Sequence, residues 1–148
     1  MKNKIPLYQV LLITLQFGGI FYFAMTGSVV PESVLPSILI IVSVINGLWA
    51  VLTMNKDTLT VMPELRKNAS LVTTGPYRFV RHPMYTSVTL LLTGMLIDNF
   101  DWMRLLVLIM VMIVLILKIN IEEKQLRMRF PAYESYQLKT KRFIPFIF

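Results

Sequence analysis

The sequence predicts an all-α integral membrane protein, a single domain with four transmembrane helices and an amphipathic C-terminal helix. Hydrophobic residues make up 55% of the 148 residues, whereas charged residues make up only 16%. The mean hydropathy is +0.64. A soluble domain of this size would have too little core volume to bury so much apolar surface. The bilayer is therefore the expected solvent for most of the chain.

The first two spans are predicted at residues 5–25 and 34–54, which are almost uncharged. A helix over the first run would cover about 31 Å, enough to cross the hydrocarbon core. The lysines before it also fit a signal peptide. The run is longer than a usual signal core, however, and no small-residue cleavage pattern follows, so a retained span is favoured. In the second run, Asn46 next to Gly47 predicts an interhelical hydrogen bond beside a close helix contact.

Residues 55–82 form the longest polar segment and are predicted to be a cytoplasmic loop. Pro83 suits the first position of a helix, so a third segment is expected at 83–97. That segment is short for a full span. After a polar turn, the fourth span is expected at 102–118. Residues 119–148 are charged and aromatic and are predicted to form a C-terminal segment that carries part of a cofactor site.

The charge distribution predicts the orientation of these spans. The formal net charge is +7, and of the 15 Lys and Arg residues only Arg104 lies in the two loops placed outside. This bias follows the positive-inside rule for four spans with both termini cytoplasmic. A prokaryotic inner membrane is the expected location for so short a chain. Topology thus accounts for the positive charge, and no nucleic-acid-binding motif is present.

The chain contains no cysteine and one histidine, His82. These counts exclude disulfides, thiolate nucleophiles and cysteine metal ligands, and no metal site is predicted.

Two polar motifs are candidates for chemistry, and we expect them to meet at one membrane face and form a site. The first, TTGPYRFVRHPMY at residues 73–85, combines a turn with Arg81, His82 and Tyr85. His82 and Tyr85 share a face of the helix that begins at Pro83. The second motif, Glu122 and Glu123, follows the fourth span. It suits either a solvated helix start, with Glu123 paired to a residue one turn on, or carboxylates that bind ribose hydroxyls or an ammonium group.

These two motifs, separated by a helical hairpin, resemble those of the isoprenylcysteine carboxyl methyltransferase family. More broadly, they are similar to the membrane methyltransferases that include phospholipid N-methyltransferases. The resemblance covers roughly residues 60–148 and includes the tail EEKQLRMRFPAYESYQLKTKRFIPF. It implies S-adenosylmethionine bound at the cytoplasmic face and a lipid-like acceptor that enters from the bilayer.

Carried over by position, the resemblance implies a set of cofactor contacts and one substrate-side residue. Lys118 stands where family members can carry an arginine near the substrate, and Ser87 stands where they often have glycine. Either glutamate of the pair would fit the cofactor role. The implied cofactor contacts are Leu71, Val72, Tyr77, His82, Pro83, Met84, Tyr85, Glu122 and Glu123.

Methyl transfer from a sulfonium needs positioning and water exclusion more than a catalytic dyad. The absence of an obvious dyad therefore agrees with a methyltransferase, and the absence of G-x-G-x-x-G excludes the soluble Rossmann type. Two alternatives stay open. One is an NADPH-dependent membrane sterol or steroid reductase, which shares a related Arg-His/Asn-Pro-x-Tyr string. The other is a non-enzymatic membrane protein that binds a partner. The acceptor and the oligomeric state are not specified by the sequence.

Overall fold

The computed structural model describes residues 6–28, 30–54, 58 and 69–143. This part of the chain is helical, with one isolated bridge between Val80 and Lys141. The elements are α1 (Leu7–Thr26), α2 (Val34–Thr53), the 3₁₀ turn η1 (Gly75–Arg78), α3 (Pro83–Asp98), α4 (Trp102–Arg129) and α5 (Tyr133–Lys139). Most of the predicted loop 55–82, the first five residues and the last five lie outside the described residues.

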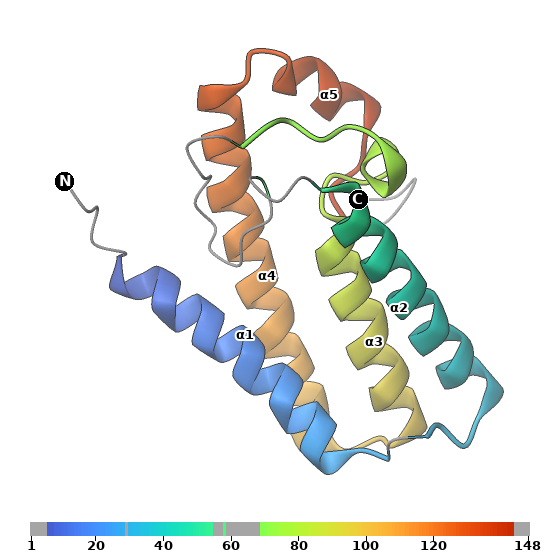
Figure 1. Ribbon diagram of the computed structural model, residues 1–148. Coiled ribbons are helices and arrows are strands. Elements are labelled where there is room, and N and C mark those ends of the chain that lie inside the picture. Colours follow the sequence, from blue (N-terminus) through green and yellow to red (C-terminus); the bar gives the residue numbers. More distant parts are fainter. Residues whose placement is uncertain (1–5, 29, 55–57, 59–68, 144–148) are drawn as a thin grey trace.

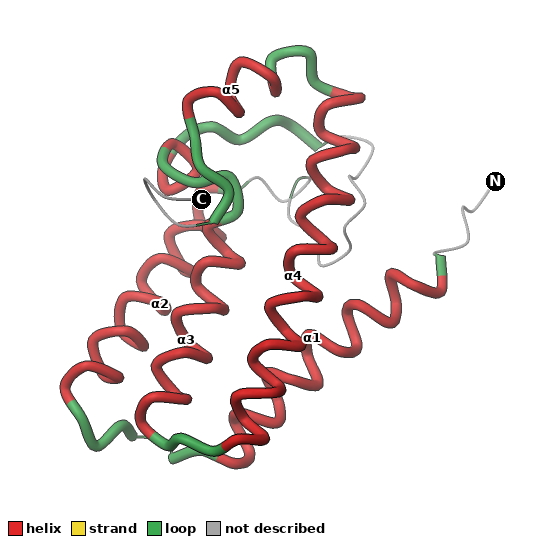
Figure 2. The backbone as a smooth tube through the Cα atoms, turned by 180° about the vertical axis from the view of Figure 1, so that it is seen from behind, coloured by secondary structure: helices red, strands yellow, loops and turns green. Residues whose placement is uncertain are grey.

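The four long helices form two pairs, α2 with α3 and α1 with α4 (Figures 1 and 2). The ends at Thr26, Asp98 and Trp102 gather at one end of the bundle, and η1 and α5 cover the other end (Figure 1). A core between α1, α3 and α4 includes Phe23 and Leu115, both fully buried. The two polar motifs of the sequence are thus carried to the same end of the molecule.

The outward surfaces of α1, α2 and α4 are apolar, as a lipid-facing surface requires. Among the described residues, these three helices are long and apolar enough to cross a membrane. Helix α3 has 16 residues and packs along α2. These three helices are candidate membrane spans, and the third predicted segment is a helix that is shorter than the other three.

Helix α4 continues past residue 118, where the predicted fourth span ends. It runs to Arg129, so Glu122 and Glu123 lie within the helix and not at the start of a new one. Residues 119–129 are mostly good helix formers, and the next proline is Pro131. Ile119 and Glu123 are also buried. The change from apolar to charged sequence marks the end of the apolar stretch but not the end of the helix.

Side-chain hydrogen bonds fix both ends of the bundle. At one end, Asp101 caps α4 by accepting from the backbone N–H groups of Met103 and Arg104, at 2.9 and 3.3 Å. Near the other end, Asn46 Nδ2 donates to the carbonyl oxygen of Pro83 at 2.9 Å and to Ser87 Oγ at 2.8 Å. The predicted interhelical role of Asn46 is confirmed. The Ser87 hydroxyl accepts one of its two hydrogen bonds, which a glycine at this position could not do.

Candidate active site

The structure brings His82, Tyr85 and Glu122 together. His82 immediately precedes α3, Tyr85 lies on its first turn, and Glu122 faces them from α4. The Tyr85 hydroxyl donates to Glu122 Oε1. The rings of His82 and Tyr85 stack with their centroids 5.7 Å apart and their planes 13° apart. The predicted convergence of the two motifs on one side of the bundle therefore agrees with the geometry.

His82 lies between the two carboxylates of the glutamate pair. Its Nδ1 is 3.5 Å from Glu122 Oε2, and its Nε2 is 3.5 Å from Glu123 Oε1. Burial by itself lowers the pKa of His82, but the two neighbouring carboxylates raise it more, so the net shift of this pKa is upward. A protonated His82 could serve both carboxylates as a donor.

Glu123 is 1% exposed and is surrounded by cationic and amide donors. Arg81 Nε donates to Glu123 Oε1 at 2.8 Å, and Arg142 donates to Oε2 from Nε at 3.2 Å and from Nη2 at 2.9 Å. Gln137 Nε2 also donates to Oε2, at 3.3 Å. We call Glu123, Arg81, Arg142 and Gln137 the Glu123 cluster. The expected pairing of Glu123 with a residue one turn on also exists, because Arg127 Nη2 lies 3.6 Å from Oε2.

The Glu123 cluster attaches the C-terminal tail to the segment that precedes α3. Arg81 Nη1 donates to the carbonyl oxygens of Gln137 and Thr140. The backbone N–H groups of Arg81 and His82 donate to the carbonyl oxygens of Lys141 and Arg142, at 2.8 and 3.2 Å. These contacts fix the backbone on both sides of His82.

Glu122 has a different environment from its neighbour. Its side chain is 20% exposed, compared with 2% for Glu123. A carboxylate offers about four acceptor positions, and the Tyr85 hydroxyl takes one of them. Glu122 is therefore the more accessible of the two carboxylates, whereas Glu123 is buried among Arg81, Arg142 and Gln137.

Lys118 lies one helical turn before Glu122 on α4. It is 2% exposed, and its Nζ donates to Gln16 Oε1 of α1 at 2.7 Å. The same Nζ lies 5.3 Å from the centroid of the Tyr85 ring. Lys118 is thus adjacent to the group formed by His82, Tyr85 and Glu122, on the side toward the interior of the bundle.

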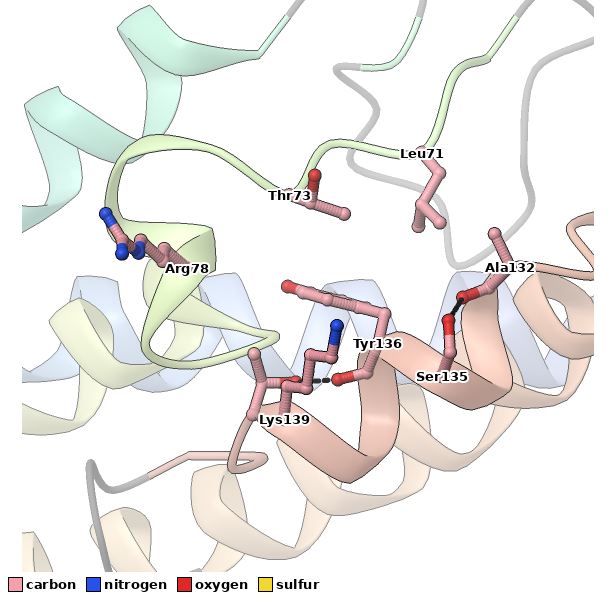
Figure 3. A pocket seen from close by; sticks show the side chains of 8 residues that line it. Leu71, Thr73, Arg78, Ala132, Ser135, Tyr136 and Lys139 are labelled. Carbon is pink, nitrogen blue, oxygen red and sulfur yellow. Dashed lines mark hydrogen bonds between the residues drawn. The ribbon is translucent and has the colours of Figure 1, made fainter.

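A pocket of about 310 Å³ lies between the segment around residues 71–78 and α5 (Figure 3). Leu71, Arg78, Tyr136 and Lys139 are among the residues that line it. Thr140 also lines it, and its carbonyl oxygen accepts from Arg81, so the pocket adjoins the Glu123 cluster. Its size falls at the lower end of the range for small-molecule sites. The predicted contact Leu71 is thereby placed at a pocket.

The remaining predicted contacts are near this pocket or at the start of α3. Tyr77 is buried, its carbonyl oxygen accepts from the Tyr136 hydroxyl at 2.5 Å, and its own hydroxyl has no hydrogen-bond partner among the described residues. Val72 is half-buried next to Leu71. Pro83 and Met84 open α3, where Pro83 is buried and Met84 is half-buried.

Burial raises the pKa of Tyr77, and the neighbouring Tyr136 and Glu122 raise it further. Its hydroxyl therefore stays protonated at physiological pH and can donate a hydrogen bond.

The sequence profile of the phospholipid methyltransferase family, PEMT, matches residues 31–132, which is more than half of the chain. The chain belongs to the phospholipid methyltransferase family. No curated protein matches it. The family match supports the broader of the two resemblances stated above, the membrane methyltransferases that include phospholipid N-methyltransferases.

The phospholipid methyltransferase match covers α2, η1, α3 and α4, and so includes His82, Tyr85, Lys118 and Glu122. Helices α1 and α5 lie outside it. Sequence reasoning missed the residues that these two parts of the chain contribute, namely Gln16 of α1 and the tail residues Gln137 and Arg142. A glutamine inside an apolar run was a usable signal for Gln16, whereas an arginine in a basic tail gave no signal of its own.

Proposed function

We propose that this phospholipid methyltransferase family member transfers a methyl group from S-adenosylmethionine to a lipid-like acceptor at the cytoplasmic membrane face. The observation that carries the proposal is the position of Glu122. Its carboxylate is held by Tyr85, lies near His82 and is one turn from the buried Lys118. Polar and ionisable groups at membrane depth mark functional sites by default, because burying them there is costly.

The proposed cofactor site has hydrogen-bonding groups that S-adenosylmethionine could engage. Glu122 can accept hydrogen bonds from ribose hydroxyls, and Tyr77 carries a buried hydroxyl without a hydrogen-bond partner among the described residues. We propose that Glu122 binds the cofactor and that Glu123 stabilises the fold. The other proposed cofactor contacts are Leu71, Val72, Tyr77, His82, Pro83, Met84 and Tyr85.

S-adenosylmethionine supplies a methyl group that is already activated by a sulfonium sulfur. In the reaction, the acceptor atom forms a bond to the methyl carbon while the carbon–sulfur bond breaks, and the electron pair of that bond remains on sulfur. The residues of the chain hold the acceptor in line and exclude water. An acceptor amine must also lose a proton, and the Glu122 carboxylate is the group we propose to take it. A carboxylate acceptor needs no base.

The acceptor class we propose is an amphiphile, either a phospholipid amine, as the family description suggests, or an isoprenylcysteine-type carboxylate. Family membership favours methyl transfer over the NADPH-dependent reductase and the non-enzymatic binding protein.

We also propose four spans, with α3 as the third and both termini cytoplasmic, on the basis of the positive-inside distribution of Lys and Arg. The chain contains no cysteine, so single cysteines can be introduced without background. Glu32→Cys and Ser135→Cys, both at exposed positions, are expected to react with a membrane-impermeant maleimide from opposite sides of oriented vesicles. Labelling of both from the same side would contradict this topology.

The function is tested by calorimetric titration of the purified protein in uncharged detergent with S-adenosylhomocysteine and, separately, with NADPH. We expect saturable binding of S-adenosylhomocysteine and no binding of NADPH. Binding of NADPH alone would replace the methyltransferase proposal with the reductase. Binding of neither ligand, by a protein that still unfolds cooperatively, would favour a non-enzymatic role.

A further inference from the structure

The pocket of about 310 Å³ lies between two walls that come from distant parts of the chain, the segment around residues 71–78 and helix α5. Its lining contains two cationic side chains, Arg78 and Lys139, and no carboxylate. Among the residues that the structure describes, neither cation forms an ion pair or a side-chain hydrogen bond. Figure 3 shows the Lys139 side chain directed from α5 toward the segment that carries Thr73 and Arg78. The pocket therefore has an uncompensated positive charge on each wall.

The hydroxyl groups of the pocket differ in whether they are available to a ligand. Those of Ser135, Tyr136 and Thr140 already donate to main-chain carbonyl oxygens, at 2.9, 2.5 and 2.7 Å. The Thr73 hydroxyl donates to no other residue in the described part of the chain. Together with the two cations, it leaves hydrogen-bond donors on both walls. Cationic and hydroxyl donors without a neighbouring carboxylate suit a phosphate group.

The length of α4 places the pocket near the lipid headgroups. Helix α4 has 28 residues and is about 42 Å long at about 1.5 Å per residue, which matches the roughly 40–45 Å of a bilayer with its headgroup layers. Helix α5 follows directly at the end of α4 (Figure 1). Each pocket cation is also next in sequence to an exposed apolar side chain, since Phe79 follows Arg78 and Leu138 precedes Lys139. Apolar side chains beside cations are typical of a surface that contacts the boundary between headgroups and acyl chains.

We propose that this pocket binds a phosphate group and that an anionic membrane lipid supplies it. The Lys139 ammonium and the Arg78 guanidinium bind the phosphate oxygens from the two walls, and the Thr73 hydroxyl donates a further hydrogen bond. The bound phosphate links α5 to the segment that precedes α3. In the proposed topology this end of the bundle faces the cytoplasmic leaflet, where anionic lipids are concentrated. The site is separate from the group formed by His82 and Glu122, and the inference does not depend on the reaction that the protein catalyses.

The inference is tested with the full-length protein in maltoside micelles, which are uncharged and contain no phosphorus. The lipid probe is dioctanoyl phosphatidic acid, and its binding is followed by phosphorus NMR. Glycerol phosphate is the soluble source of the same group. Dioctanoylglycerol has the same acyl chains but no phosphate, so its failure to displace the probe controls for partition into the micelle.

The variants are Lys139→Gln and Arg78→Gln. Lys124→Gln is the matched control, because Lys124 is an exposed lysine of α4 that does not line the pocket. Wild type and Lys124→Gln are expected to bind phosphatidic acid saturably and more tightly than glycerol phosphate. Lys139→Gln and Arg78→Gln are each expected to weaken this binding about tenfold, because each removes one charge-assisted hydrogen bond. Thermal unfolding checks that the variants are folded.

A loss of affinity confined to the two pocket variants supports the inference. The inference is overturned if Lys124→Gln loses as much affinity as Lys139→Gln, since binding would then be a diffuse effect of positive charge, or if wild type shows no saturable binding. Equal affinity for glycerol phosphate and phosphatidic acid would support the phosphate site but overturn the membrane lipid as its source. Should Arg78→Gln fail to fold, Lys139→Gln decides.

Competition with S-adenosylhomocysteine separates this site from the proposed cofactor site. Leu71 lines the pocket and is also a proposed cofactor contact, so the phosphatidic acid titration is repeated in saturating S-adenosylhomocysteine. Simultaneous binding of both ligands supports two separate sites. Displacement of phosphatidic acid would assign the pocket to the cofactor and overturn the inference. A wild type that binds phosphatidic acid but not S-adenosylhomocysteine contradicts the proposed function alone.

Discussion

Replacing Glu123 with alanine is expected to lower the free energy of unfolding by about 3–5 kcal/mol, the usual cost of removing one partner from a buried charge pair. The variant leaves the side chain of Arg81, which is only 9% exposed, without its carboxylate. It also removes the acceptor of Arg142 and Gln137, and with it the link between α4 and the C-terminal tail. Thermal unfolding in detergent would measure the loss.

Limited trypsin digestion gives a second readout of the same variant. Cleavage after Lys141 and Arg142 is expected to become faster, because the Glu123 cluster supports the backbone hydrogen bonds between the tail and residues 79–82. Glu134→Ala is the matched control, since Glu134 is an exposed glutamate in the first turn of α5. An unchanged melting temperature together with unchanged tail cleavage in Glu123→Ala would show that the cluster does not stabilise the tail.

The sequence was sufficient to predict helices α1, α2 and α3 and to expect that the two polar motifs meet. Pro83 marked the start of α3, and the apolar runs placed α1 and α2 within two residues of their observed ends. Asn46 was correctly read as an interhelical donor. These features depend on local periodicity, on turn chemistry and on the cost of burying one amide. All three can be evaluated over short stretches of sequence.

The roles of the two glutamates could not be separated in this way. Adjacent residues on a helix point about 100° apart, so one of the pair can be buried while the other faces a ligand. Which one is buried depends on Arg81 and Arg142, which lie 42 and 19 residues away from Glu123. Likewise, the apolar-to-charged boundary at Lys118 did not reveal that α4 continues. The amphipathic pattern after residue 118 indicated a helix but not that the first part of it continues α4 and the second part is the separate helix α5.

Glu122→Gln is expected to weaken S-adenosylhomocysteine binding by about 10- to 100-fold while leaving the fold intact. Hydrogen bonds to charged groups contribute about 1.5–3 kcal/mol, and every 1.4 kcal/mol corresponds to a factor of ten in affinity. The amide oxygen of glutamine can still accept from the Tyr85 hydroxyl, so the contact between α3 and α4 is conserved. Calorimetric titration measures the affinity, and thermal unfolding checks the fold.

The informative comparison is between Glu122→Gln and Glu123→Gln, which make the same chemical change at neighbouring positions. If Glu122 binds the cofactor and Glu123 stabilises the fold, then Glu122→Gln loses affinity for S-adenosylhomocysteine while its melting temperature is almost unchanged. Glu123→Gln, by contrast, loses stability first, because an amide cannot replace a charge that faces Arg81 and Arg142. The reverse pattern, with affinity lost in a folded Glu123→Gln and retained in Glu122→Gln, would exchange the two assignments. Equal losses of stability in both variants would make the whole glutamate pair structural, and the pocket lined by Leu71 and Tyr136 would be the next place to test for cofactor binding.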